Sequence, residues 1–392
     1  MSKWEWKKLK DICEKGSSNI KQSDLKDLTG DYPIFGASGY IQNVDFYQRD
    51  RDYIGIIKDG SGVGRTMLLP AFSSVIGTLQ YILPKEGNDI KFINYALQNI
   101  DFSKSVQGAA IPHIYFKDYG ETEILVPPLS EQKRIVKFLD EEFSKIETLK
   151  TNTETNLKNA KELFETTLEK ELNPLSRHSE RSEESSADLP SGWEWIKIST
   201  LVTKCLNIKW DKIALNDSRL YIDLSSVNKD TQCIENVSEI NVENAPSRAK
   251  QIIHEKDVLF ATTRPTQKRV CIVEREFDNQ ICSTGFCVLR PQACLESKYL
   301  FYCLLSDDYY SYIKPLEKGA NYPAVTDGDV KNYEISLPPL SVQKEIVARL
   351  DKLSENVKRL EANYKQIIAD CDELKKSILK KTFEGDSRSS RE

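Results

Sequence analysis

With 392 residues, 39% of them hydrophobic and 29% charged, the chain is long enough for two or three domains with apolar cores. A formal net charge of −5 argues against a basic, stand-alone DNA binder, and the lack of any apolar run near the roughly 20 residues of a membrane span argues against a membrane protein. Nine scattered cysteines and three histidines show no metal-ligand spacing, so we expect no zinc site and a cytoplasmic location.

The first expected domain covers residues 1–128 and mixes short β-rich runs with turn signals. Residues 53–57 and 66–70 predict two strands around the polar loop 58–65. A short helix is expected near residues 93–97.

The run Gly60-Ser61-Gly62-Val63-Gly64 invites comparison with a phosphate-binding loop. It lacks the spacing of a dinucleotide fingerprint, and no Lys-Ser/Thr pair follows it. We therefore predict a hairpin turn, from which Lys58 and Arg65 could still reach a phosphate.

The domain closes with the turn Gly108-Ala109-Ala110-Ile111-Pro112-His113-Ile114 and a last strand that ends at Pro127-Pro128. This turn has two interpretations. In the first it is a structural turn that leads into the last strand. In the second it exposes a backbone edge to a ligand.

A first long helix is expected at residues 129–172, because proline confines the preceding residue to extended geometry and ends the strand. Ser130 is the expected N-cap. The helix should be about 60 Å long. Its apolar stripe drifts, so this helix is expected to contact more than one neighbour.

Residues 173–192 are expected to form a polar linker, and residues 193–338 a second strand-rich domain. The same texture of strand, polar loop, strand and helix returns there, at residues 257–261, 262–269, 270–273 and 299–305.

The loop of this second domain holds the densest cluster of side-chain types that read DNA bases, Arg264, Thr266, Gln267, Lys268 and Arg269. Arginine can bond guanine bidentately, and glutamine can bond adenine. Many surface loops are equally polar, so an ordinary solvated loop remains the alternative.

A second long helix is expected at residues 339–384, with Ser341 as N-cap and a polar tail at 385–392. Its apolar residues alternate at spacings of four and three, which is the seam of a coiled coil. The seam consists of Ile346, Leu350, Leu353, Val357, Leu360, Tyr364, Ile367, Cys371, Leu374 and Ile378.

The chain contains an internal repeat. Residues 126–140 return 211 positions later as residues 337–351, with ten of fifteen identical. The turn at 108–114 returns at the same offset as 319–325, which includes Asn321. Trp4-Glu5-Trp6 has its counterpart in Trp193-Glu194-Trp195. Each half should therefore do a similar job.

The expected fold is α+β, with two strand-rich globular domains separated by two long antiparallel helices that form a coiled coil. The order of domain, helix, linker, domain and helix then gives a repeat with approximate two-fold symmetry.

These residues resemble the specificity subunit of Type I restriction-modification systems. The resemblance rests on two domains that open on Trp-Glu-Trp and close on Pro-Pro-Leu-Ser-x-Gln-Lys-x-Ile-Val before a long helix. The segments Asp257-Val258-Leu259-Phe260 and Ser283-Thr284-Gly285-Phe286-Cys287-Val288-Leu289-Arg290-Pro291 also resemble target recognition domains. The resemblance covers nearly the whole chain.

The resemblance implies a non-catalytic subunit that reads a bipartite double-stranded DNA target, with one recognition domain for each half-site. The helices would set the gap. Two modification subunits, which bind S-adenosylmethionine, would dock on the repeated regions, and motor-nuclease restriction subunits are an optional further partner. The domains differ in length, with 121 residues from Trp6 to Pro127 and 143 from Trp195 to Pro338, so the target should be asymmetric.

No cofactor or metal is expected on this chain itself. The residues assigned to DNA binding are Lys58, Ser61, Arg65, His113, Arg264, Thr266, Gln267, Lys268, Arg269 and Asn321. The residues assigned to the scaffold and its partners are Gln132, Lys133, Ile135, Leu139, Gln343, Lys344, Ile346 and Leu350.

Two other functions compete with this interpretation. A self-contained adenine methyltransferase is suggested by Asn321-Tyr322-Pro323-Ala324, which superficially resembles a methyltransferase loop. That segment lacks the double proline, and no glycine-rich cofactor loop accompanies it. A coiled-coil adaptor without DNA specificity is compatible with the Pro-Pro repeats alone.

Overall fold

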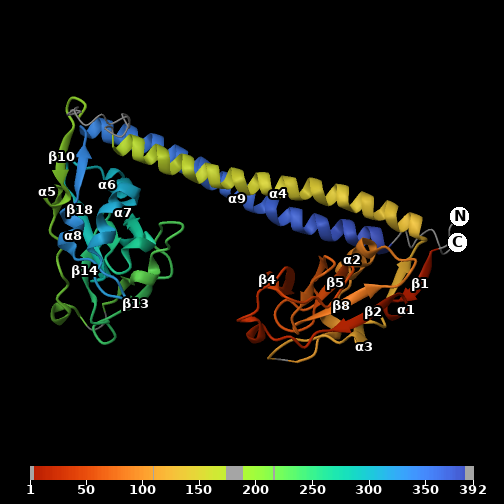
Figure 1. Ribbon diagram of the computed structural model, residues 1–392. Helices are drawn as coiled ribbons and strands as arrows, with labels where there is room; N and C mark the ends of the chain where they lie inside the picture. The colour runs from red at the N-terminus through yellow and green to blue at the C-terminus, as the bar shows by residue number, and fades with distance from the viewer. Residues whose placement is uncertain (1–3, 109, 174–188, 215–216, 385–392) are drawn as a thin grey trace, which may run out of the picture. The chain divides into compact units, whose positions relative to one another are not determined.

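Two compact units make up the chain in the computed structural model (Figure 1), which describes residues 4–108, 110–173, 189–214 and 217–384. The first unit combines Met1–Thr155 with Tyr364–Glu392, and the second is Asn156–Asn363. Each unit holds one strand-rich module and one stretch of each of two long helices. The expected α+β organisation is confirmed.

Module one is the strand-bearing part of the first unit. Its strands are β1 (Glu5–Lys8), β2 (Cys13–Ser17), β3 (Tyr32–Gly36), β4 (Gly39–Val44), β5 (Tyr53–Ile57), β6 (Thr66–Leu69), β7 (Ser74–Val75), β8 (Leu79–Pro84) and β9 (Glu123–Val126). Its helices are α1 (Leu9–Ile12), α2 (Ile90–Gln98) and α3 (Phe116–Tyr119), with 3₁₀ turns η1 (Gln22–Leu25) and η2 (Phe102–Ser105).

Module two is the strand-bearing part of the second unit. Its strands are β10 (Glu194–Lys197), β11 (Val202–Thr203), β12 (Arg219–Ile222), β13 (Ser238–Ile240), β14 (Ala249–Ile253), β15 (Val258–Ala261), β16 (Val270–Ile272), β17 (Gln280–Ser283), β18 (Phe286–Pro291) and β19 (Glu334–Leu337). Its helices are α5 (Ile198–Leu201), α6 (Ser297–Leu305), α7 (Asp307–Ile313) and α8 (Asp327–Lys331), with 3₁₀ turns η4 (Trp210–Lys212), η5 (Leu224–Ser226), η6 (Pro265–Gln267), η7 (Arg275–Phe277) and η8 (Lys314–Leu316).

The two modules share one sheet topology. The order β2-β8-β5-β6 in module one corresponds to β11-β18-β15-β16 in module two, and β4-β3-β7 corresponds to β13-β12-β17. The sheet that holds β3 and the sheet that holds β12 each contain one parallel pair, β3 with β7 and β12 with β17. Strand β14 adds a further edge in module two by pairing with β17, and it accounts for part of that module's greater length.

The Trp-Glu-Trp echo has a structural counterpart. Strand β1 pairs antiparallel with β9, and β10 pairs in the same register with β19. Glu5 faces Val126 in the first sheet, as Glu194 faces Leu337 in the second. Each module is therefore closed by its own first and last strands, immediately before a long helix.

The long helices are α4 (Leu129–Leu172) and α9 (Leu340–Glu384). Within each unit their segments lie side by side and run antiparallel (Figure 1). In the first unit Lys150 pairs with Asp372 at 2.8 Å and Glu147 pairs with Lys375. In the second unit Arg349 pairs with Glu171 at 2.6 Å and Lys161 with Glu361 at 3.9 Å.

The predicted seam of α9 is partly buried. Ile346, Leu350, Val357 and Cys371 are buried, whereas Leu360 and Leu374 are exposed. Leu360 and Leu374 stand fourteen residues apart and share one heptad position, whereas the buried Val357 and Cys371 share the other. The exposed leucines are thus available for other contacts.

The start of each long helix differs from the prediction. We expected Ser130 and Ser341 to be N-caps, but α4 begins at Leu129 and α9 at Leu340, so both serines lie inside the first turn. The carbonyls of Pro128 and Pro339 accept the first helical bonds, from Gln132 and Gln343 at 3.0 Å each. The second proline of each pair is therefore the N-cap residue, two positions before the serine that we expected there.

Each unit has its own apolar cores. In module one, α2, α3 and the β2-β8-β5-β6 sheet pack with the first turns of α4 and the last turns of α9, where Phe92 meets Phe383 at 5.3 Å between ring centroids. In module two, α6 and α7 pack against β15, β18 and the adjacent turns of both long helices. Among the described helices, none combines the length and apolar character required to cross a membrane. Most of the expected linker 173–192 and the tail 385–392 lie outside the described residues.

Candidate nucleic-acid interface

The polar loops predicted in the two modules are structurally equivalent. Loop one, residues 58–65, joins β5 to β6 as the predicted hairpin. Loop two, residues 262–269, joins β15 to β16, and this pair of strands is antiparallel too. The backbone N–H of Ile57 donates to Arg65 O at 2.9 Å, and that of Ala261 donates to Arg269 O at 3.0 Å. The loops therefore have equal length on the same frame, although their sequences have little in common.

Each loop packs against the Gly-Ala-x-x-Pro turn of its own module. Ile114 N–H donates to Lys58 O at 2.9 Å, and Val325 N–H donates to Thr262 O at the same distance. Each turn is then followed by a short helix, α3 or α8, and only afterwards by the last strand. The structure therefore brings His113 beside loop one and Asn321 beside loop two.

In module one, Ser61 and Arg65 are exposed, and Lys58 is half-buried with its ammonium 3.6 Å from Asp59. His113 is half-buried, with Nδ1 3.1 Å from Ile111 O and its ring edge-on to Tyr115 at 5.2 Å. These groups give loop one and its turn a polar surface.

In module two, Arg264, Thr266, Gln267 and Asn321 are exposed, while Lys268 and Arg269 are half-buried and engaged within the module. Lys268 Nζ donates to Asp307 at 2.8 Å and lies 4.7 Å from the centre of the Tyr310 ring.

Arg269 donates to the Val227 carbonyl. An open depression of about 500 Å³ is lined by Lys229, Asp230, Thr266, Gln267, Lys268 and Arg269.

Sequence reasoning did not select the exposed apolar residues around the two turns. Ile111 is 64% exposed in module one, and Tyr322, 211 positions later, is 70% exposed in module two. Tyr115 is exposed beside His113. The signal that could have found them is that both turns occupy the same repeat position and place a large apolar residue there.

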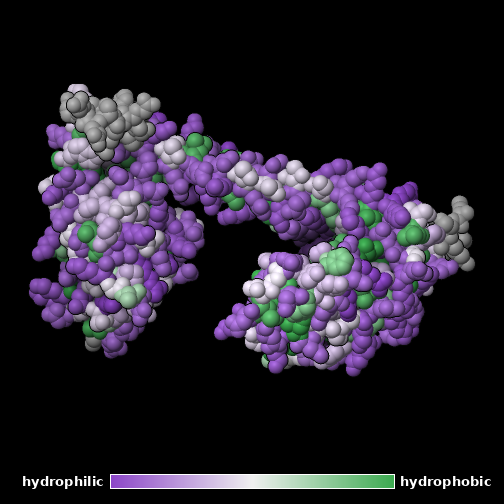
Figure 2. Space-filling view, in the orientation of Figure 1, coloured by the Kyte–Doolittle hydropathy of each residue, from purple (hydrophilic) through white to green (hydrophobic). Residues whose placement is uncertain are grey.

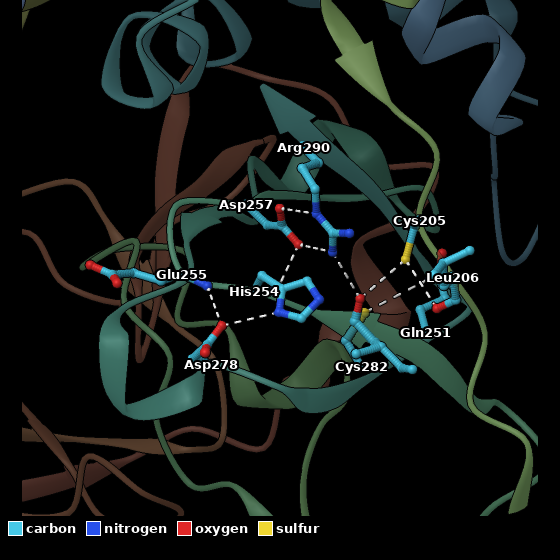
Figure 3. A network of polar contacts seen from close by, with 10 residues as sticks. Cys205, Leu206, Gln251, His254, Glu255, Asp257, Asp278, Cys282 and Arg290 are labelled. Atoms are coloured by element: carbon cyan, nitrogen blue, oxygen red, sulfur yellow. Dashed lines mark hydrogen bonds and ion pairs between the residues drawn. The ribbon is translucent and has the colours of Figure 1, made fainter. Parts of the chain in front are cut away.

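The two segments of module two that resemble recognition domains are joined by a buried ion pair (Figure 3). Arg290 Nε and Nη2 donate to the two carboxylate oxygens of Asp257 at 2.9 and 2.8 Å, and Asp257 is almost fully buried. The hydrogen bond to Asp257 raises the pKa of Arg290 above its usual value. Asp257 also accepts from His254 N–H at 2.8 Å.

Next to this pair, the ring of His254 lies 3.1 Å from Asp278. The backbone N–H of Glu255, together with that ring, lowers the pKa of Asp278. This network fixes the ends of β14, β15 and β18, so it supports the module and does not present a reactive group to a ligand.

The scaffold residues fall into buried and exposed groups. Gln132 and Gln343 are each 1% exposed, and Ile135, Leu139, Ile346 and Leu350 are buried in the module cores. Gln132 donates to Pro127 O at 2.9 Å and accepts from Asp89 N–H at 2.7 Å; Gln343 donates to Pro338 O at 2.9 Å and accepts from Glu296 N–H at 2.8 Å. Lys133 and Lys344 remain exposed on the same turns.

The described residues show no catalytic or metal-binding arrangement of side chains. Within them, no group of three or more histidine, cysteine or acidic residues could hold a metal ion. The nine cysteines are free thiols. Burial raises the pKa of Cys13 to about 12, which keeps that thiol protonated at neutral pH.

A family model described as the Type I restriction modification DNA specificity domain matches residues 1–159 and 190–369. The EcoDI specificity subunit of Escherichia coli is 19% identical over 98% of this chain and 88% of the relative. The MjaVIII specificity subunit of Methanocaldococcus jannaschii is 22% identical over 98% and 93%. The HindI specificity subunit of Haemophilus influenzae is 27% identical, but over only 36% of this chain and 31% of the relative.

Two solved structures share the fold. One, from work on complex assembly and conformational transition of the type I R-M system, has a TM-score of 0.71 at 19% identity, covering 97% of both chains. The HsdS subunit of Thermoanaerobacter tengcongensis has a TM-score of 0.55 at 20% identity, covering 98% of this chain and 97% of that one.

Proposed function

Because the chain belongs to the Type I restriction modification DNA specificity family, we propose that it is the subunit that determines which DNA sequence such a complex recognises. Each module reads one half of a split double-stranded target. The observation that carries this proposal is the pair of equivalent loops, which present different side chains on the same backbone frame. Two modules that share one fold but carry different loop side chains suit a target whose two half-sites differ in sequence.

The long helices act as the spacer. Helix α4 has 44 residues and α9 has 45, so each is about 66 Å long at 1.5 Å per residue. Their antiparallel packing within each unit makes them stiff, and their length sets the gap between the two half-sites.

Two copies of a modification subunit dock on the repeated parts of the helices. Leu149 and Leu163 of α4 are exposed, and so are Leu360 and Leu374 of α9, each 211 positions later. Figure 2 shows scattered apolar residues on the mainly hydrophilic surface of the two helices. Exposed apolar residues in repeated positions suit two copies of one protein partner.

The ion pairs between the helices group these leucines. In the first unit, the pairs Glu147–Lys375 and Lys150–Asp372 bring Leu149 and Leu374 to the same level. In the second unit, Lys161–Glu361 does the same for Leu163 and Leu360. Each unit therefore offers two exposed leucines at one level of its helix pair, and we call these two residues its leucine patch.

The chain itself is non-catalytic in this proposal. The modification subunits bind S-adenosylmethionine and transfer its methyl group to adenine, and motor-nuclease restriction subunits are optional further partners. The net charge of −5 fits a reader that relies on its partners for much of the phosphate contact.

The test is to co-express the full chain with its modification subunit in a host that lacks other adenine methyltransferases, and to map methylated adenines across the genome. We expect methylation at one asymmetric motif with two defined half-sites and a constant gap. The same modification subunit without this chain is the control and should leave no motif. Methylation without a motif by the assembled complex would refute the proposal.

A further inference from the structure

Loop two adopts glycine-type backbone conformations without glycine. Arg264 has φ 50° and Lys268 has φ 53°, both in the left-handed region. At the equivalent positions of loop one, 204 residues earlier, stand Gly60 with φ 98° and Gly64 with φ 87°. Left-handed conformations are unfavourable for residues that carry a Cβ, so module two tolerates strain that module one avoids.

The backbone N–H at the position of Gly60 and Arg264 makes the same hydrogen bond in both modules. Gly60 N–H donates to Pro112 O at 2.9 Å, and Arg264 N–H donates to Pro323 O at 2.7 Å. The frame therefore does not require an arginine at this place. Because strained residues concentrate at functional sites, the side chain of Arg264 is the feature to be explained.

The Arg264 side chain is held on an exposed aromatic ring. Its guanidinium carbon lies 4.8 Å from the centre of the Tyr322 ring, and Nη2 donates to Asn321 O at 3.4 Å. Among the described residues, no carboxylate forms an ion pair with this guanidinium. A cation on a tyrosine face is oriented without being neutralised, so most of its donors stay free.

Module one places no cation at the corresponding point. Gly60 has no side chain, and the position of Tyr322 is taken by the exposed Ile111. The two modules thus differ at this point in charge, size and hydrogen-bonding capacity, although the backbone is the same.

We infer that Arg264 is a specificity-determining residue of module two, which reads a guanine in its half-site, and that Tyr322 is the residue that positions it. The planar fork of arginine matches the O6 and N7 acceptors of guanine in the major groove. The inference rests on the proposed function and extends it to one residue and one base.

The test uses the full chain assembled with its modification subunits and duplexes that carry the mapped target. Arg264→Gly suits the experiment because glycine is the residue that loop one uses in this conformation, so the fold should be kept. We expect the variant to lose about tenfold or more of its discrimination at one G·C pair of the module-two half-site. Selectivity at the other half-site should not change.

A modified base distinguishes a hydrogen bond to the guanine from electrostatic attraction to the DNA backbone. Replacing the target guanine by 7-deazaguanine removes N7, and it should weaken the wild-type complex but not the Arg264→Gly complex. Arg275→Ala, which removes an exposed arginine of the same module on η7, is the charge control and should keep full discrimination.

The positioning role of Tyr322 has its own readout. Tyr322→Phe keeps the ring and should keep the discrimination, whereas Tyr322→Leu should reduce it at the same G·C pair. Equal behaviour of these two variants would overturn the positioning role.

Two outcomes oppose the inference at different levels. If Arg264→Gly weakens binding uniformly on every sequence, or leaves discrimination intact, Arg264 does not read a base and the inference fails while the proposed function stands. If the wild-type complex shows no sequence preference, the proposed function itself fails.

Discussion

Tyr95 of α2 donates a hydrogen bond of 2.6 Å to Asp140 of α4, and the same bond recurs at 2.7 Å between Tyr302 of α6 and Asp351 of α9. The second carboxylate oxygen of each aspartate accepts from a lysine, Lys91 at 2.7 Å or Lys298 at 2.6 Å. Each module is thus tied to its long helix by one repeated three-residue contact.

Removing this contact should destabilise the unit that holds it. Asp140→Ala leaves the partly buried Tyr95 hydroxyl without its acceptor, and we expect the free energy of unfolding to fall by about 1 kcal/mol. The exposed ion pair with Lys91 adds little. Urea denaturation measures the change, and Lys133→Ala, an exposed change on the same helix, is the control. Equal effects of the two variants would contradict the assigned bond.

Asp140 should also make stability depend on pH. Burial acts to raise its pKa, but the hydrogen bonds from Lys91 and Tyr95 and the charge of Lys91 together lower the pKa below its usual value. Its contribution is therefore complete above the unfolded-state pKa of about 3.9 and is lost as pH falls through the lower folded-state pKa. The stability advantage over Asp140→Asn should be constant from pH 7 to 5 and shrink towards pH 3. If the stability advantage over Asp140→Asn grew on acidification, the pKa of Asp140 would not be lowered in the folded protein.

Gln343 should be a structural residue. Its amide bonds the carbonyls of Cys294 and Pro338 at 2.9 Å each and the N–H of Glu296 at 2.8 Å. Gln343→Leu leaves the buried Pro338 carbonyl and the two partly buried groups without their partner, so the free energy of unfolding should fall by about 2–3 kcal/mol. Thermal unfolding tests this, with the exposed Lys344→Ala as control. A stability loss no larger than that of the control would show that the buried amide is dispensable.

The buried pair of module two should show strong coupling. Asp257→Ala leaves Arg290 with an unpaired charge near the interior, and we expect a loss of about 3 kcal/mol. The double variant Asp257→Leu with Arg290→Met should lose clearly less, because no charge is left behind. Hydrogen exchange in β15 and β18 measures the effect, while β5 and β8 of module one serve as the internal control. A double variant that loses as much stability as Asp257→Ala would argue against a coupled pair.

The leucine patches should set the number of bound partners. Leu149→Glu with Leu374→Glu places two charges in the first unit's patch, so native mass spectrometry should find one modification subunit bound in place of two. The matched change at Leu163 and Leu360 should have the same effect, and all four changes together should abolish binding. Two subunits retained on the fourfold variant would place the docking surface elsewhere.

Much of the fold was predictable because its signals are local. The Pro-Pro step and the heptad spacing mark the long helices within a few turns of chain, and the strands around residues 58–65 and 262–269 follow from short apolar runs between turns. The N-caps at Ser130 and Ser341 were wrong by two residues, because proline geometry and serine capping compete over one short stretch.

The candidate site was predictable only in part. The sequence pointed to Arg264 and to Lys58 by residue type, but it did not show that their loops are equivalent. The repeat offset changes from 211 at the turns to 204 at the loops, and hardly any side chains match there. In the sequence, the constant 211-residue offset holds only from Gly108 onward, and upstream of it only the Trp-Glu-Trp segment matches, whereas the sheet orders extend the repeat through both modules.

The sequence by itself therefore determined the repeat, the two long helices and the family resemblance, since periodicity and identity are properties of the chain. Only the tertiary structure decided that Gly60 and Arg264 occupy one position and that Tyr322 lies under the Arg264 guanidinium. Both relationships depend on backbone hydrogen bonds and contacts between residues more than 50 positions apart, and no local pattern in the sequence encodes such contacts.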